Sequence, residues 1–187
     1  MINYDRGGNI TQVTDALGNI TKREYDLAGQ LIKLTDPLGN ETQFTYTVIG
    51  QIESIKNPKG DTKTYSYYPG GRIKTITQPC GESESYEYDK NGNIIKVKDA
   101  LDNETMLVYD SLDRVIETIN SIGHSKKFDD DAIGNITGIT DENGNITQYK
   151  YSPLGDIIEV IDAVGHRTKR HRNPSYLQRT KSANQHH

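Results

Sequence analysis

The sequence predicts an all-β protein, built as a repetitive array of antiparallel β-hairpins with about 21 residues per unit. A tyrosine recurs at a spacing of 21 residues, and Asp130 holds one of its slots. Turn residues centred on glycine recur every 10 to 11 residues, which is typical of short strands joined by tight turns. Only 33% of the residues are hydrophobic, too few for a thick core, whereas stacked repeats bury only a thin strip against their neighbours.

The repeat is aligned on one tyrosine and one glycine in each unit, and we expect both to be structural rather than reactive. Glycine supplies the positive φ that the corner of a tight turn needs. The tyrosine ends the strand that leads into this corner. The structural repeat positions are Tyr4, Tyr25, Tyr46, Tyr67, Tyr88, Tyr109 and Tyr151, together with Gly8, Gly29, Gly50, Gly71, Gly92, Gly134 and Gly155.

Each unit contains two turn signals about half a period apart, of which Asp36 to Asn40 is an example with the pattern Asp-x-x-Gly-Asn. The leading Asp or Asn can accept a hydrogen bond from the backbone two residues further on, which forms an Asx-turn. One corner departs from the pattern, because Asp113-Arg114 replaces Gly-Asn. Asp tolerates the left-handed region better than most residues, so we expect this turn to form as well.

Two kinds of strand lie between the turns. In one kind the regular apolar positions are three apart, as in Ile73 and Ile76, which predicts a bulge or sharp twist at the strand entrance. The other kind alternates, as in Thr42, Phe44 and Tyr46, which places these side chains on one face. We expect a polar face and a Tyr-rich face, with each tyrosine ring beside its equivalent in the next unit. Glycine and Asx residues recur too often for helices.

The sequence predicts one repeat array over residues 4–170, of about eight units, followed by a basic, disordered tail over residues 171–187. From Arg167 onward there are six cations and no acid, whereas the rest of the chain has a net charge of −10. An acidic body argues against nucleic acid as the main partner. No apolar run approaches the length of a membrane span, and we expect no signal peptide ahead of the first repeat.

No residue pattern indicates a catalytic, cofactor-binding or metal-binding site. Asp89, Asn91 and Asn93 place oxygen ligands at alternate positions, but the glycine and the bidentate glutamate of a calcium loop are missing. We therefore interpret this turn as Asx-turn chemistry. The five histidines do not cluster as zinc ligands. Cys80 is the single cysteine, which excludes an internal disulfide, and no base is indicated that would activate it.

The Tyr-rich face leaves two interpretations open. Aromatic rings can stack on sugars while neighbouring polar groups satisfy the sugar hydroxyls, so the face could bind glycans. The rings can also be the core of the sheet, which is the interpretation that we favour. The exposed edges of an open array could, in addition, pair with a second copy of the chain.

One motif carries a resemblance to a known family. The pattern Tyr-Asp-x-x-Gly-Asn-Ile-x-x-Val-x-Asp-x-x-Gly-Asn-x-Thr, which Tyr4 to Thr21 follow, resembles the YD repeat, also called the Rhs repeat. The resemblance covers Tyr4 to about Lys169. Proteins with this repeat include bacterial Rhs and wall-associated polymorphic toxins, cocoon components of insecticidal toxin complexes, and teneurins. The resemblance implies a long β-sheet that spirals into a hollow shell, of which eight units would form part.

The resemblance also implies a function. In the toxins the shell encloses a C-terminal toxic domain, and in teneurins it is part of an adhesion ectodomain. We therefore expect a non-catalytic structural module that helps to encapsulate or present a toxin, with the rest of a larger shell or the toxin as its partner. The alternative is an adhesion or carbohydrate-binding module on the same sheet. The implied location is secreted or at the cell surface.

Overall fold

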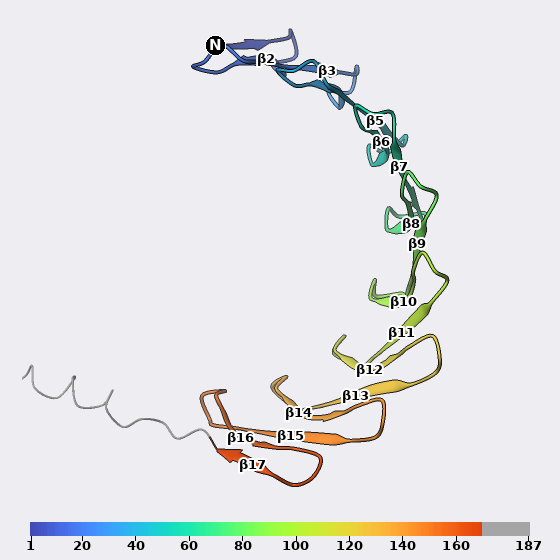
Figure 1. Ribbon diagram of the computed structural model, residues 1–187, viewed down its shortest axis with the longest axis vertical. Coiled ribbons are helices and arrows are strands. Elements are labelled where there is room, and N and C mark those ends of the chain that lie inside the picture. Colours follow the sequence, from blue (N-terminus) through green and yellow to red (C-terminus); the bar gives the residue numbers. More distant parts are fainter. Residues whose placement is uncertain (170–187) are drawn as a thin grey trace, which may run out of the picture. The chain divides into compact units, whose positions relative to one another are not determined.

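The computed structural model describes residues 1–169, and β-strands are the only regular elements within them (Figure 1). The first strands are β1 (Ile2–Tyr4), β2 (Ile10–Thr14), β3 (Ile20–Tyr25), β4 (Leu31–Thr35), β5 (Glu41–Tyr46), β6 (Ile52–Lys56), β7 (Thr62–Tyr67), β8 (Ile73–Thr77), β9 (Ser83–Tyr88) and β10 (Ile94–Lys98). The others are β11 (Glu104–Tyr109), β12 (Val115–Ile119), β13 (Ser125–Asp130), β14 (Ile136–Thr140), β15 (Ile146–Tyr151), β16 (Ile157–Ile161) and β17 (Arg167–Lys169). The all-β prediction is therefore confirmed.

The chain divides into two compact units, of which the first is Met1–Glu104 and the second begins at Thr105, inside β11. In the first unit each strand pairs antiparallel with the next one along the chain, from β1 to β10. The second unit repeats this order from β11 to β17. Every contact between paired strands is thus local in sequence, as in other repeat proteins.

Two kinds of strand pairing alternate along each of the two compact units. The longer kind joins β3 to β4, where Tyr25 lies opposite Leu31 and Glu24 lies opposite Lys33. Ile32 is left over between these two pairs, so it forms a bulge at the entrance of β4. The shorter kind joins β4 to β5 and has regular register from Lys33 to Thr35. The bulge predicted from the spacing of apolar residues is confirmed, and it recurs in every longer ladder.

The two faces of the sheet differ in polarity, as the alternation predicts. On one face Phe44 lies opposite Ile55 and Tyr46 lies opposite Ile52. On the other face Thr45 and Ser54 share a hydrogen bond of 2.7 Å between their hydroxyls. Salt bridges of lysine to glutamate extend this polar face to either side. Such half-exposed ion pairs contribute at most about 1 kcal/mol each.

The structure has no conventional core. Within residues 1–169 no hydrophobic side chain is buried, because the apolar face carries no second layer of the same chain. Large aliphatic residues at the turns are mostly exposed to solvent; Leu38 has 87% of its surface exposed and Leu154 has 77%. Hydrogen bonds between neighbouring strands and side-chain contacts along one face therefore hold the array together.

The predicted array boundary and tail are not tested. The tail over residues 171–187 lies outside the described residues, and the array limit at residue 170 lies just beyond them. The described part ends with β17, in which Arg167 and Lys169 lie near Glu159 of β16.

Replacing a corner glycine should cost more than replacing the exposed residue beside it. Gly155 has φ of 82° and no atom within 4 Å of an added Cβ, so Gly155→Ala tests backbone strain alone. We expect the free energy of unfolding to fall by about 1 kcal/mol. Leu154→Ala, next to it, should change that free energy by less than about 0.5 kcal/mol. Urea denaturation of both variants measures the difference, and equal values would contradict a role for φ at this corner.

Candidate functional site

The corners are held by a carboxylate that caps its own turn. The Asp36 Oδ1 atom accepts hydrogen bonds from the backbone N–H groups of Leu38 and Asn40, at 2.9 and 2.8 Å. The Asn40 side chain donates to Oδ2 at 2.8 Å. These donors lower the pKa of Asp36, with the Asn40 side chain as the largest cause. The Asx-turn prediction is confirmed here and at Asp89, whose oxygens are taken up by N–H groups of its own turn.

Several of the repeat tyrosines connect their repeat to the one before it through the phenol hydroxyl. The Tyr46 hydroxyl donates to the backbone carbonyl of Leu31 at 2.8 Å. The same bond, always to the residue fifteen positions earlier, is made by Tyr25, Tyr67 and Tyr151 at distances of 2.6 to 2.9 Å. We call this bond the tyrosine latch. Burial raises the pKa of Tyr46 and of Tyr67, because desolvation disfavours the charged phenolate.

The latch lies where the backbone ladder stops. The register of β4 with β5 begins at Lys33, so the carbonyl of Leu31 lies beyond the paired part of that ladder. A backbone carbonyl without a partner is costly once it is shielded from water. The hydroxyl of Tyr46, at the far end of β5, supplies the missing donor. The latch therefore ties together the ends of two strands that the bulge has separated.

The expected ladder of stacked tyrosine rings is wrong. Successive repeat tyrosines lie on alternate strands, such as β5 and β7, so two strand spacings of about 4.8 Å separate them. That separation exceeds the range of about 4.5–7 Å over which aromatic rings pair. Among the described residues the ring pair in contact is Tyr68 with Tyr88, which do not occupy equivalent positions. Equivalent rings share a face, but their hydroxyls make the link between units.

The predicted repeat positions occupy equivalent places in the fold. Each of the predicted tyrosines ends its strand, and Tyr4 on β1 is 59% exposed. The predicted glycines all have positive φ, between 80° and 102°. Asp113 takes the place of glycine with φ of 59°, as expected from its sequence context. Asp102 has φ of 65° at the second turn of its repeat, and the missing glycine between Asp99 and Asn103 was the signal that could have identified it.

Side chains at the corners also contact the next repeat. The Gln51 side chain donates to the carbonyl of Gly71 at 2.6 Å. Gln30 approaches Gly50 in the same way, and its Nε2 atom would lie 2.9 Å from a Cβ at that position. At these two corners, the residue after the glycine therefore lies against the equivalent corner of the next repeat. Sequence reasoning did not identify this contact, because the residues concerned are 20 positions apart and vary in type.

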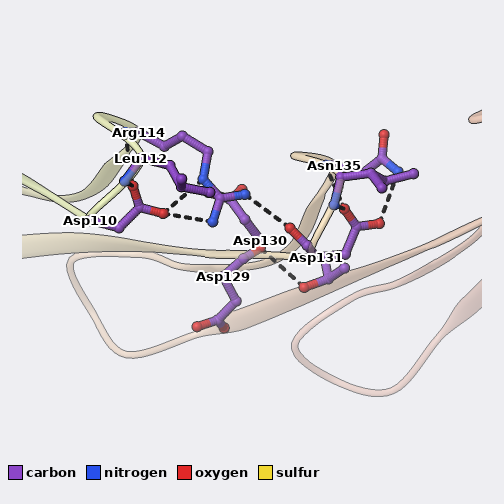
Figure 2. A network of polar contacts seen from close by, with 9 residues as sticks. Asp110, Leu112, Arg114, Asp129, Asp130, Asp131 and Asn135 are labelled. Carbon is purple, nitrogen blue, oxygen red and sulfur yellow. Dashed lines mark hydrogen bonds and ion pairs between the residues drawn. The ribbon is translucent and has the colours of Figure 1, made fainter.

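The two irregular repeats contact each other through a network of polar side chains around Arg114 and Asp130 (Figure 2). The guanidinium of Arg114 binds Asp110 of its own turn, with Nε and Nη2 at 2.7 and 2.6 Å from Oδ2. Its Nη1 atom donates to the carbonyl of Asp131 at 2.9 Å, and Nε lies 3.7 Å from the carboxylate of Asp130. Asp130, in the tyrosine slot, has a side chain that is 8% exposed. We call these contacts the arginine clasp, which stands where a tyrosine latch would be.

The described residues contain no cluster of side chains that could hold a metal ion. Among residues 1–169 no three side chains of His, Cys, Asp or Glu lie close enough together to hold a metal ion. His166 caps Asp162 of its own turn at 3.1 Å, and Cys80 is exposed on a corner. No helix that could cross a membrane occurs over the same residues.

Comparison with family models identifies the repeat. The model described as RHS Repeat matches residues 4–41, 25–62 and 131–167, which together make up just over half of the chain. The model described as Teneurin YD-shell matches residues 61–121. A search of curated proteins found no match.

Solved structures with a similar fold come from toxin complexes. TcdB2-TccC3-TEV has a TM-score of 0.64 at 23% identity, over 88% of this chain and 10% of that chain. A Photorhabdus luminescens Tc holotoxin pore with a mutated TccC3 has a TM-score of 0.60 at 19% identity, over 92% and 12%. TcdB2-TccC3-Cdc42 has a TM-score of 0.60 at 18% identity, also over 92% and 12%. This chain thus spans about a tenth of the length of the chains that it matches, and the likeness establishes the fold.

Removing one latch should weaken one junction. Tyr46→Phe deletes the hydroxyl and leaves the Leu31 carbonyl without its donor. We expect the free energy of unfolding to fall by about 0.5–1.5 kcal/mol, and amide exchange near Leu31 to accelerate. Tyr4→Phe is the matched control, because Tyr4 lies exposed on β1 and should change little. Equal effects of the two variants in urea denaturation would argue against the latch.

The arginine clasp should behave as a coupled pair. Arg114→Asn and Asp130→Tyr each restore one consensus residue but leave the other partner unmatched. Each single variant should be destabilised, and the double variant should recover stability through a new tyrosine latch. The interaction energy from the double-mutant cycle should be about 0.5–3 kcal/mol. If the effects of the two single changes simply add, the residues are not coupled.

Acid should loosen the corners in a defined range of pH. Asp36 has a pKa below its ordinary value, so it contributes stability above the unfolded pKa of about 3.9 and loses it as pH falls through the folded pKa. Asp5, Asp15 and Asp141 are shifted in the same direction. We expect thermal melts to vary little between pH 7 and about pH 5 and to shift downward below about pH 4. Asp36→Asn should lessen the dependence of the melting temperature on pH, because an asparagine side chain does not ionise. The amide oxygen of Asn57 caps its own turn in the same way as the Asp36 carboxylate.

Proposed function

Because the chain belongs to the RHS repeat family, we propose that it is a segment of a β-shell whose complete form encloses or presents a C-terminal toxin, as in Rhs-type polymorphic toxins. The match of the family model to just over half of the chain carries this proposal. The likeness to chains from toxin complexes supports it. The partners of the segment are then the rest of the shell and the enclosed toxin, and the location is secreted or at the cell surface.

The geometry suits a wall better than an active site. The junctions use tyrosine latches or, at one place, the arginine clasp, together with capped corners and backbone ladders, and these contacts fix shape. The turn carboxylates already accept hydrogen bonds from their own turns, so they are engaged in structure. We therefore propose a non-catalytic role, in which the repeat positions set the spacing and direction of successive strands.

The wall proposal also accounts for the half-covered apolar face. A sheet without a second layer leaves Phe44, Tyr65 and Ile76 partly exposed. In a longer protein this face can be covered by other parts of the same chain, and this segment covers only about a tenth of the chains that it resembles.

Protection of the downstream domain tests the proposal. The complete gene product should be expressed and subjected to limited proteolysis, with the separately expressed C-terminal domain as the control. We expect the C-terminal domain to be degraded much more slowly within the complete protein than alone, and to become sensitive when Tyr25, Tyr46 and Tyr67 are together changed to Phe. Equal degradation rates in the two contexts, or a gene that encodes no domain beyond the repeats, would refute the proposal.

A further inference from the structure

Two corners of the array carry an arginine directly after the turn. Arg72 and Arg114 occupy equivalent positions, two repeats apart. In both, the Nη1 atom donates to the backbone carbonyl seventeen positions further on, at 3.0 Å from Arg72 to Asp89 and at 2.9 Å from Arg114 to Asp131. The two guanidinium groups are therefore held at the same place in the repeat, and their surroundings can be compared directly.

The carboxylates around the later arginine are replaced by aromatic rings at the earlier one. Asp110 accepts hydrogen bonds from Nε and Nη2 of Arg114, and Asp130 lies 3.7 Å from Nε (Figure 2). Tyr68 and Tyr88 hold the equivalent two positions at the earlier corner. No residue among 1–169 accepts a hydrogen bond from Nε or Nη2 of the earlier arginine. The edge of the guanidinium that binds a carboxylate at one corner is thus unoccupied at the other.

The guanidinium of Arg72 is fixed by the rings beside it. Its Cζ atom lies 5.4 Å from the centre of the Tyr88 ring, a separation at which a ring attracts a cation. Tyr88 meets Tyr68 edge to face, with centroids 6.1 Å apart and planes at 90°. The Tyr68 hydroxyl in turn donates to the carbonyl of Tyr86 at 3.1 Å. Because the side chain is already held in place, binding a ligand costs it little further conformational entropy.

The two acids near this corner are both engaged elsewhere. Glu87 lies on the other face of β9, where its carboxylate is 4.0 Å from the ammonium of Lys96. The Asp89 carboxylate accepts hydrogen bonds from N–H groups of its own turn. Asp131 is capped in the same way at the later corner, and there the arginine binds a further carboxylate. A capped aspartate therefore does not take the place of a ligand for the guanidinium.

Space and charge at the corner suit an anionic group. A depression of about 440 Å³ lies beside Arg72, with Pro69 and Tyr68 in its lining. The ammonium of Lys74 lies 5.8 Å from the centre of the Tyr68 ring and forms no ion pair with any residue among 1–169. Two cations without carboxylate partners thus flank one depression, and the rings and the proline offer apolar surface beside them.

We propose that the depression at Arg72 binds the carboxylate side chain of an acidic peptide segment, which accepts from Nε and Nη2 as Asp110 does from Arg114. Asp110 is a precedent within the chain, because it presents a peptide-borne carboxylate to the same edge of an equivalent guanidinium. An apolar residue next to the acid would pack on Pro69 and the rings. The doubly charged phosphate is disfavoured by the nearby charge of Asp89. The proposal goes beyond the shell function and does not depend on it.

Titration of the whole chain with short peptides, followed by NMR of the Arg72 Nε–H group, tests the site. The probes are an acetylated and amidated Ala-Leu-Glu-Ala peptide, its glutamine and phosphoserine analogues, and acetate. We expect the glutamate peptide to cause a saturable shift and to bind at least fivefold more tightly than the glutamine peptide or acetate. Absence of a saturable shift, or equal binding of the glutamine peptide, would overturn the proposal. Tighter binding of the phosphoserine peptide, or equal binding of acetate, would overturn the assignment to a peptide carboxylate.

Occupying the guanidinium from within the chain gives the matched variant. Tyr68→Asp places a carboxylate where Asp110 stands at the equivalent corner, so it should retain the fold and lower peptide affinity at least tenfold. Arg72→Lys keeps the charge but removes the paired donors, and it should lower the affinity at least fivefold. Lys59→Ala, which removes a cation at another corner, should leave binding unchanged. Undiminished binding by either of the first two variants would count against the site, whatever the outcome of the proteolysis test.

Discussion

The structure depends on the hydrogen bond from a tyrosine hydroxyl to a backbone carbonyl in the preceding unit. Each bulge, such as that at Ile32, separates the ends of two strands and leaves a carbonyl beyond the ladder. The tyrosine crosses that opening and supplies the donor. Because no hydrophobic side chain is buried within residues 1–169, this bond and the strand ladders take the place of a core. The array is therefore stabilised junction by junction, as expected for a nearly one-dimensional protein.

The corners add a second connection that runs parallel to the first. Some turns are capped by their own carboxylate, as at Asp36, and at other corners the side chain after the glycine reaches the next repeat, as Gln51 does with Gly71. Ladder, latch and corner thus link the same neighbouring units at different places along the strands. A substitution in one repeat should affect mainly that repeat and its neighbours. Within each of the two compact units, no described contact joins repeats that are far apart in the sequence. This locality suits a wall, whose function is its continuity.

Much of the fold follows from periodicity alone. The alternation of Thr42, Phe44 and Tyr46 predicts which side chains share a face of the sheet. The spacing of Ile73 and Ile76 predicts the bulge. Asp36 and Gly39 predict the capped turn. The partner of the tyrosine hydroxyl could not be predicted, because it is a backbone carbonyl and leaves no side-chain signature. The arginine clasp could not be predicted either. Arg114 and Asp130 each depart from the repeat pattern, but a single sequence does not indicate that the two side chains are in contact.

The arginine clasp restricts how these repeats can be exchanged during evolution. Arrays of near-identical units are prone to unequal crossing-over, which deletes or duplicates whole periods. A crossover between positions 114 and 130 would separate the cation from its acidic partner and would leave an aspartate where the neighbouring unit offers only a carbonyl. A crossover at a latched junction places a tyrosine from one repeat next to the equivalent backbone carbonyl of another repeat, so the latch can still form. Gain or loss of units should therefore be tolerated along most of the array and selected against at this junction.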